Sequence, residues 1–108
     1  MTSSQKNTPL PNGFVEFLRE VAKETAVKKI VLFGSRATGR FKERSDIDLT
    51  FFSEEISTKE WSFLVNEIEN NSITLLNVDM IHFEKIKDTN FQKRILSEAR
   101  ILYTVSKK

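Results

Sequence analysis

A glycine and a serine stand a short distance before a pair of acids in the segment LFGSRATGRFKERSDIDLTFF, residues 32–52. Ten residues separate Ser35 from Asp46, and one apolar residue separates Asp46 from Asp48. A glycine permits a sharp turn after a strand and a close approach of a ligand to the backbone. The serine hydroxyl and the N–H groups at the start of a helix suit a phosphate, so Gly34 and Ser35 predict a phosphate-binding turn.

The acids predict a cation site. On a strand, Asp46 and Asp48 point to the same face, roughly 6.6 Å apart along the strand. Neighbouring carboxylates repel one another unless a cation lies between them, and Mg²⁺ takes such oxygen ligands at about 2.0 to 2.1 Å. Asp79, the only acid in the apolar stretch LNVDMIH, supplies a third carboxylate. Three acids on neighbouring strands predict a two-metal site, which stabilises the attacking and leaving oxygens of a displacement at phosphorus.

Basic residues fill the segment between the serine and the acids. Arg36 is the candidate for a contact with phosphate, because it opens the helix beside Ser35. The other basic residues of this segment could contact a triphosphate or a partner, although such a run is more often a solvated loop. His82, the only histidine, is interpreted as a residue at a strand end, since metal activation of an acceptor leaves little need for a general base.

Other interpretations of the same residues remain open. A Gly-Ser turn and a pair of acids also occur at strand ends that bind nothing. Residues 34–41 nearly match a P-loop, but Arg40 replaces the lysine that reaches the phosphates and Phe41 offers no hydroxyl to a metal. A metal-dependent nuclease would use the carboxylates without needing Gly34 and Ser35.

The elements that must position these residues follow from the spacing of the apolar side chains. The capping-box sequence STKE, residues 57–60, opens a helix that ends at Asn70. Other helices are predicted at 13–25 and about 89–99, the latter with Phe91, Ile95, Leu96 and Ala99 inward, and strands at 29–33, 46–52, 73–83 and 101–105. Strands alternating with helices predict a two-layer α/β fold, a small mixed sheet with helices mainly on one face.

Composition restricts the class of protein. The 108 residues fit a flexible leader, 1–11, and one domain, 12–108. The net charge of +2 does not indicate a polybasic nucleic-acid module, although it leaves nucleic-acid binding open. The chain has no cysteine, which excludes disulfides and thiolate metal sites. It has no apolar run near the ~20 residues that span a bilayer, so we expect a soluble, cytoplasmic protein without a membrane partner.

The segment GSRATGRFKERSDIDL resembles the GSx10DxD signature of the minimal nucleotidyltransferases (MNT) of the DNA polymerase β-like superfamily. The likeness continues through VDMI to the terminal RILSEARILY. It implies the polymerase β-like nucleotidyltransferase fold and the transfer of a nucleoside monophosphate from an NTP, most often ATP, to a hydroxyl. Gly34 and Ser35 would then hold the β- and γ-phosphates. Asp46 and Asp48 would bind two Mg²⁺ ions, and Asp79 would bind the ion that activates the acceptor.

The resemblance also implies a partner. Small members of the family commonly act with a helical protein, which is either a substrate-binding subunit or a HEPN-type ribonuclease toxin. With the toxin, the chain would be an antitoxin that adenylylates a tyrosine of its partner. With the subunit, it would act on a small molecule or an RNA. A non-enzymatic antitoxin that occludes its partner is a further alternative, and the short length also suggests a partner or a homodimer.

Overall fold

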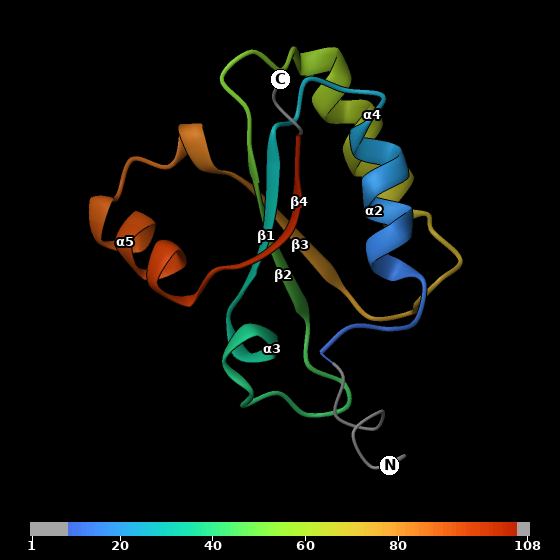
Figure 1. Ribbon diagram of the computed structural model, residues 1–108, viewed down its shortest axis with the longest axis vertical. Helices are drawn as coiled ribbons and strands as arrows, with labels where there is room; N and C mark the ends of the chain where they lie inside the picture. The colour runs from blue at the N-terminus through green and yellow to red at the C-terminus, as the bar shows by residue number, and fades with distance from the viewer. Residues whose placement is uncertain (1–8, 106–108) are drawn as a thin grey trace.

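A four-stranded mixed sheet forms the centre of the computed structural model, which describes residues 9–105 (Figure 1). The strand order is β3-β2-β1-β4; β1 is antiparallel to β2 and to β4, whereas β2 and β3 are parallel. The predicted small mixed α/β sheet is thus confirmed. The elements in chain order are α2 (Phe14–Ala22), β1 (Lys29–Phe33), α3 (Ser35–Thr38), β2 (Ile47–Phe52), α4 (Thr58–Glu69), β3 (Val78–His82), a 3-10 turn η1 (Phe83–Lys85), α5 (Thr89–Glu98) and β4 (Arg100–Thr104).

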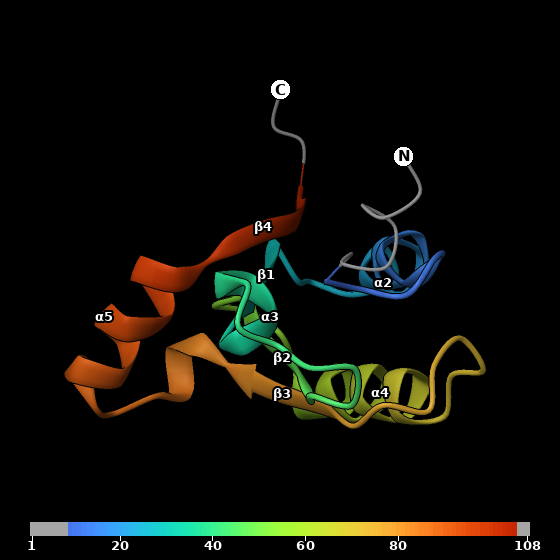
Figure 2. The same cartoon turned by 90° about the horizontal axis from the view of Figure 1, so that it is seen from below.

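One face of the sheet carries the larger apolar core. The side chains of Ile47, Leu49 and Phe51 alternate along β2 and are fully buried there, as their spacing predicts. They pack with the inward faces of α2 and α4. Figures 1 and 2 show both helices on the same side of the sheet.

The opposite face is covered in part by α5. Ile95 is fully buried against Val31 and Phe33 of β1, and the Phe91 ring lies edge-on to Phe33 at a centroid distance of 6.1 Å. Two helices therefore cover one face and a single helix covers the other (Figure 2). Leu96, predicted to point inward, is 54% exposed, because the inward stripe of α5 runs through Phe91, Ile95 and Ala99 and leaves Leu96 on the solvent side.

Several element boundaries match the sequence prediction. Ser57 caps α4, since its hydroxyl accepts from the Glu60 N–H at 3.0 Å. The third predicted strand was too long, because β3 begins only at Val78. The segment before it turns instead, and the Asn71 side chain accepts from the N–H groups of Ile73 and Thr74. The first predicted helix also ends early, at Ala22.

The predicted leader falls partly outside the described residues, which begin at residue 9. Leu10 is buried in the larger core, and the Pro9 carbonyl accepts a hydrogen bond from Arg36 at 2.9 Å. Residues 9–11 therefore contact the domain, and the boundary at residue 11 stays a prediction. Among residues 9–105, every helix is too short or too polar to cross a bilayer.

Candidate active site

The pairing of three strands brings two of the predicted acids side by side. Asp48 is the partner of Phe33 on β1 and of Asp79 on β3. Residues paired in this way share one face of a sheet, so both acids lie on the face that α5 covers. Asp46 precedes β2 at the same end of the strand and is exposed.

The pKa of Asp48 is raised because the acids lie close together and the side chain is partly buried. Burial raises the pKa of Asp48 to about 6, and the charge of Asp79 and a hydrogen bond with it add to the rise. The charge of Asp46 raises that pKa further, whereas Arg94 of α5 opposes the rise. A carboxyl group in these surroundings is short of positive charge.

Gly34 makes room for this carboxylate. Its backbone has φ +79°, a conformation that favours glycine. A Cβ placed on it would lie 2.5 Å from Oδ2 of Asp48, well inside contact distance. The glycine of the predicted turn is thus required by the backbone and by the approach of an acid from the next strand.

Ser35 begins α3 directly after this turn. The helix is a single turn, in which the N–H groups of Ala37 and Thr38 donate to the Gly34 carbonyl. Its first residues lie where β1 ends and β2 begins (Figure 1). The structure therefore brings Ser35 to the same end of the sheet as Asp46 and Asp48, as the spacing predicted.

Arg36 has a different environment from the one that a phosphate contact needs. Its side chain is 4% exposed, and burial lowers its pKa. The guanidinium donates to the carbonyls of Ser45, Pro9, Lys42 and Glu43 at 2.9 to 3.2 Å. It also lies 4.8 Å from the centroid of the Phe41 ring. These contacts favour a role in holding the 39–46 loop, and thereby Asp46, over direct contact with a phosphate.

Two residues of α5 also reach the site, and no motif in the sequence indicated them. The Gly34 N–H donates to Oε1 of Glu98 at 2.9 Å. Oε2 of the same carboxylate pairs with Nε of Arg94 at 3.4 Å. A predicted phosphate donor is therefore already bonded, although 64 residues separate the two partners in sequence.

His82 lies at the far end of β3 from Asp46. Its Nε2 is 2.7 Å from the Ser53 carbonyl, which can only accept, so this nitrogen carries the proton. The ring stacks on Trp61 at a centroid distance of 5.3 Å. These contacts confirm His82 as a packed residue of the strand end.

The donor set is chemically suited to Mg²⁺. Carboxylate oxygens are the ligands this ion prefers, and a divalent cation would supply the charge that Asp48 and Asp79 lack. Within residues 9–105, however, no three His, Cys, Asp or Glu side chains are grouped closely enough to hold a metal. The contact between Asp48 and Asp79 is formed, while a metal site that includes Asp46 stays a prediction.

A groove of about 650 Å³ opens beside Asp46. Glu43 and Arg44 form one wall, and the segment 73–77 before β3 forms the other. Asp46 lines this groove, whereas Asp48 and Asp79 do not.

A protein-family model described as polymerase beta nucleotidyltransferase matches residues 16–108. This chain belongs to the polymerase beta nucleotidyltransferase family. The match covers the turn, all three acids and α5, and it confirms the resemblance carried by the GSx10DxD signature. The enzyme class, nucleotidyltransferase, follows from it.

Individual relatives agree with this assignment. A chain from Methanocaldococcus jannaschii, described as a proposed protein adenylyltransferase, is 30% identical over 87 residues, which cover 71% of this chain and 79% of the relative. A crystal structure of a toxin–antitoxin pair with AMP-PNP contains a similar chain, with a TM-score of 0.67, 17% identity, and coverage of 85% and 74%.

Two further structures share the fold. A chain in the complex of a tri-AMPylated Shewanella oneidensis HEPN toxin with its MNT antitoxin aligns with a TM-score of 0.53 and 18% identity, covering 94% of this chain and 72% of that one. A proposed nucleotidyltransferase from Sulfolobus solfataricus aligns with a TM-score of 0.57 and 22% identity, covering 94% and 85%. These likenesses establish the polymerase β-like fold.

Proposed function

We propose that this chain transfers AMP from ATP to a hydroxyl of a partner protein in a Mg²⁺-dependent reaction. The observation that carries the proposal is the meeting of Asp48, Asp79 and the Gly34 turn at one end of the sheet. The relative described as a protein adenylyltransferase and the fold shared with an MNT antitoxin support AMP as the group transferred.

Each part of the site has a distinct task in this proposal. Ser35 binds the terminal phosphates, because it begins α3 at the same end of the sheet as the acids. Asp46, Asp48 and Asp79 would hold the two Mg²⁺ ions, which would lower the pKa of the acceptor hydroxyl and neutralise the leaving pyrophosphate. Gly34 allows Asp48 to approach, and Arg36 secures the loop that carries Asp46.

The acceptor enters from the groove beside Asp46. In-line transfer requires the attacking oxygen opposite the leaving pyrophosphate. Asp46 lines the groove, so an acceptor placed there would lie next to the acids that are proposed to hold the metal. Its apolar residues Leu75 and Ile73, which are 103% and 38% exposed, would contact the side chain that carries the hydroxyl.

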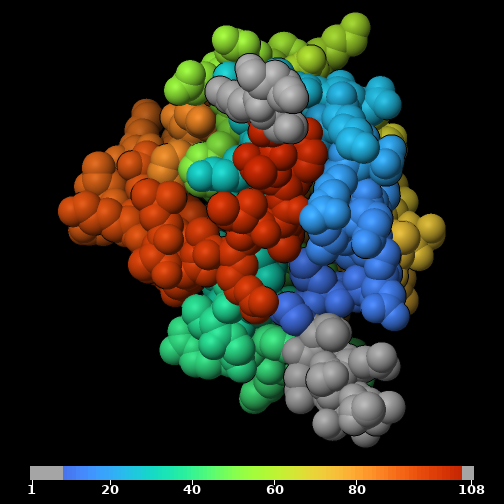
Figure 3. All heavy atoms as spheres, viewed as in Figure 1, coloured from blue at the N-terminus to red at the C-terminus, as the bar shows by residue number. Residues whose placement is uncertain are grey.

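A helical partner, such as a HEPN-type toxin, would present the acceptor. Apolar side chains at the surface support an interaction with another chain, among them Leu96 of α5 and Ile101 of the edge strand β4, which are 54% and 63% exposed. Figure 3 shows β4 at the surface between α5 and α2.

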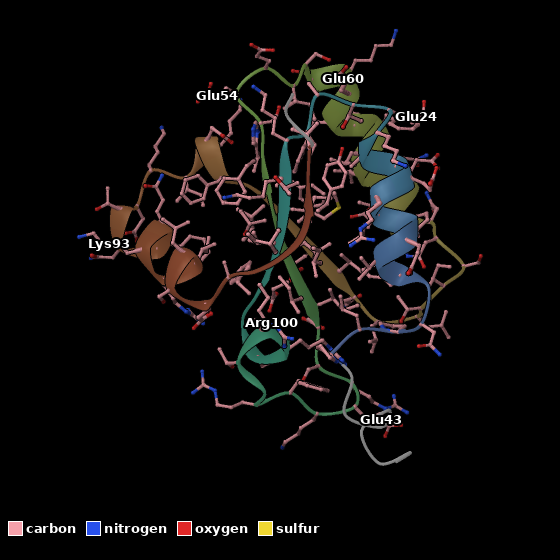
Figure 4. The ribbon with its side chains drawn as sticks, viewed as in Figure 1. Glu24, Glu43, Glu54, Glu60, Lys93 and Arg100 are labelled. Carbon is pink, nitrogen blue, oxygen red and sulfur yellow. The ribbon has the colours of Figure 1, made fainter. Side chains whose placement is uncertain are left out.

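The direct test incubates the chain with its co-purifying partner, Mg²⁺ and ATP labelled in the α-phosphate. We expect label on the partner, an added AMP by mass spectrometry, and a loss of at least about 100-fold in Asp46→Asn and Asp48→Asn. Glu54→Gln is the control, because this acid lies beyond the opposite end of β2 (Figure 4).

Other outcomes identify the alternatives. Full activity in both aspartate variants would overturn the proposal. If they neutralise a toxic partner as well as the unmodified chain does, the protein acts by occlusion. Label on a small molecule or an RNA instead of the protein would indicate a substrate-binding subunit as partner, and cleavage of single-stranded nucleic acid without ATP would indicate a nuclease.

A further inference from the structure

We propose that Arg94 and Glu98 of α5 complete the triphosphate site. Arg94 contacts the phosphates of ATP, and Glu98 is a positioning residue that fixes both Arg94 and the turn at Gly34. This inference rests on the proposed nucleotide-binding function and adds a binding residue that lies far from the GSx10DxD segment in sequence.

Glu98 joins α5 to the phosphate-binding turn. Its carboxylate accepts from the Gly34 N–H at 2.9 Å through one oxygen and pairs with Arg94 through the other. The Glu98 side chain is 15% exposed, so its bond to the Gly34 N–H is partly buried, whereas its pair with Arg94 is exposed to solvent. A hydrogen bond to a charged acceptor is stronger than a neutral one, which makes Glu98 an effective anchor for a turn with an unusual backbone conformation.

Arg94 lies on the correct face of the sheet. It directly precedes Ile95, which packs on Val31 and Phe33 of β1. Asp48 and Asp79 share that face, because Asp48 pairs with Phe33. The Arg94 side chain is 61% exposed and therefore remains accessible to a ligand at the edge of the acids.

The charges of the site call for such a residue. The triphosphate of ATP is an anion that must approach a turn flanked by Asp48 and Glu98. Arg94 is the residue whose positive charge acts on Asp48 in the described part of the chain. Its bond to Glu98 is made through Nε, and a guanidinium carries further N–H donors suited to phosphate oxygens.

Phosphate binding is measured directly, without transfer. A fluorescent non-hydrolysable ATP analogue is titrated into the chain with Mg²⁺, and inorganic tripolyphosphate is then used as a competitor. For Arg94→Gln we expect both affinities to fall about ten-fold, the effect of one lost charge-assisted hydrogen bond. Arg94→Lys should recover part of the loss, because it restores the charge.

Lys93→Gln is the matched control for this charge. Lys93 neighbours Arg94 on α5, but it lies on the outer side of the helix, away from the sheet (Figure 4). The Lys93→Gln substitution removes the same charge from the same helix, so we expect the affinities for the ATP analogue and for tripolyphosphate to stay unchanged. An Arg94→Gln variant that binds both ligands as tightly as Lys93→Gln does would overturn the inference.

Variants of Glu98 separate positioning from binding. Glu98→Gln keeps an oxygen that can accept from the Gly34 N–H but loses the ion pair, so we expect a higher KM for ATP with kcat nearly unchanged. Glu98→Ala loses both bonds, and we expect kcat to fall as well. Equal kinetics in the unmodified chain and Glu98→Gln would contradict the positioning role, and this variant preserves the test if Glu98→Ala fails to fold.

The two proposals fail in different ways. If ATP binds and Arg94→Gln weakens it, but no AMP is transferred, the transferase proposal fails and this inference stands. If AMP is transferred and depends on Asp48 but not on Arg94, only this inference fails. A chain that binds neither ATP nor tripolyphosphate contradicts both.

Discussion

The two faces of β2 have opposite properties. Ile47, Leu49 and Phe51 form an apolar face that is fully buried under α2 and α4. Asp48 and Thr50 point to the other face, where a carboxyl group has its pKa raised to about 6 and a buried hydroxyl has no hydrogen-bond partner among the described residues. The side chains of the apolar face are fully packed. On the other face, the Asp48 carboxyl lacks positive charge and the Thr50 hydroxyl lacks a hydrogen-bond partner among the described residues.

Stability and function are thus assigned to alternate residues of one strand. The apolar face holds the fold together, while the face with the acids lowers stability because it concentrates charge. Clustered active-site acids commonly have this cost, which bound ligand offsets. Substitutions on each face test the contrast, and we expect the largest change in the free energy of unfolding on the apolar face.

Leu49→Ala should have the largest effect. Leu49 is 0% exposed in the centre of the larger core, so removing most of its side chain leaves a cavity that costs about 3 kcal/mol. Thermal unfolding monitored by circular dichroism measures the loss. The exposed Leu96→Ala is the control for the same change in side chain, and an equal loss in both variants would contradict the assignment of the core.

Gly34→Ala should lower stability by about 2 kcal/mol and reduce AMP transfer more than stability alone explains. The new Cβ would lie 2.5 Å from Oδ2 of Asp48, and the alanine would have to adopt φ +79°, which is strained for a residue with a side chain. Gly39→Ala is the matched control, because its φ is +87° and nothing lies within 4 Å of an added Cβ. If both variants keep equal activity, the contact with Asp48 has no functional importance.

Asp48→Asn should raise stability in EDTA at neutral pH while abolishing transfer. The pKa of Asp48 is about 6 in the folded chain, above its ordinary 3.8. The folded state therefore binds more protons between these values, and its stability falls as pH rises from about 4 to 6. Because Asp48 is partly exposed, screening reduces the gain from the substitution to about 1 kcal/mol at pH 7.5.

Melting temperatures at several pH values measure this gain. The stability gained by Asp48→Asn should vanish near pH 4, and it should be smaller when Mg²⁺ stabilises the unmodified chain. Asp46→Asn is the comparison, since Asp46 is exposed and should gain less. No difference between Asp48→Asn and the unmodified chain at pH 7.5 would show that the charge of Asp48 is already compensated.

Thr50→Val should produce the smallest change, a gain of about 0.5 kcal/mol. Thr50 is 0% exposed, and its hydroxyl has no partner among the described residues. Valine has nearly the same shape without the buried polar atom. Denaturant unfolding measures the gain, and a loss of stability would indicate that water or another group bonds this hydroxyl. Transfer should be unchanged, which separates this position from Asp48 on the same face.

Much of the fold was predictable because its signals are local. The capping box at Ser57 and the apolar alternation along β2 depend on residues a few positions apart, and both predictions are confirmed. The length of β3 was not predictable from alternation, because the Asn71 side chain bonds the backbone that follows it and turns the segment. Likewise, the surface position of Leu96 depends on how α5 is rotated against β1.

The family, the Gly-Ser turn and the candidate acids could be identified from the sequence, because a fixed spacing of residue types is a property of the chain. Which groups meet depended on the tertiary structure alone. Strand pairing sets Asp48 beside Asp79, the α5–β4 junction brings Glu98 to Gly34, and the folded 39–46 loop surrounds Arg36 with carbonyls. These contacts join distant segments, and their energies depend on register and burial, which no local pattern encodes.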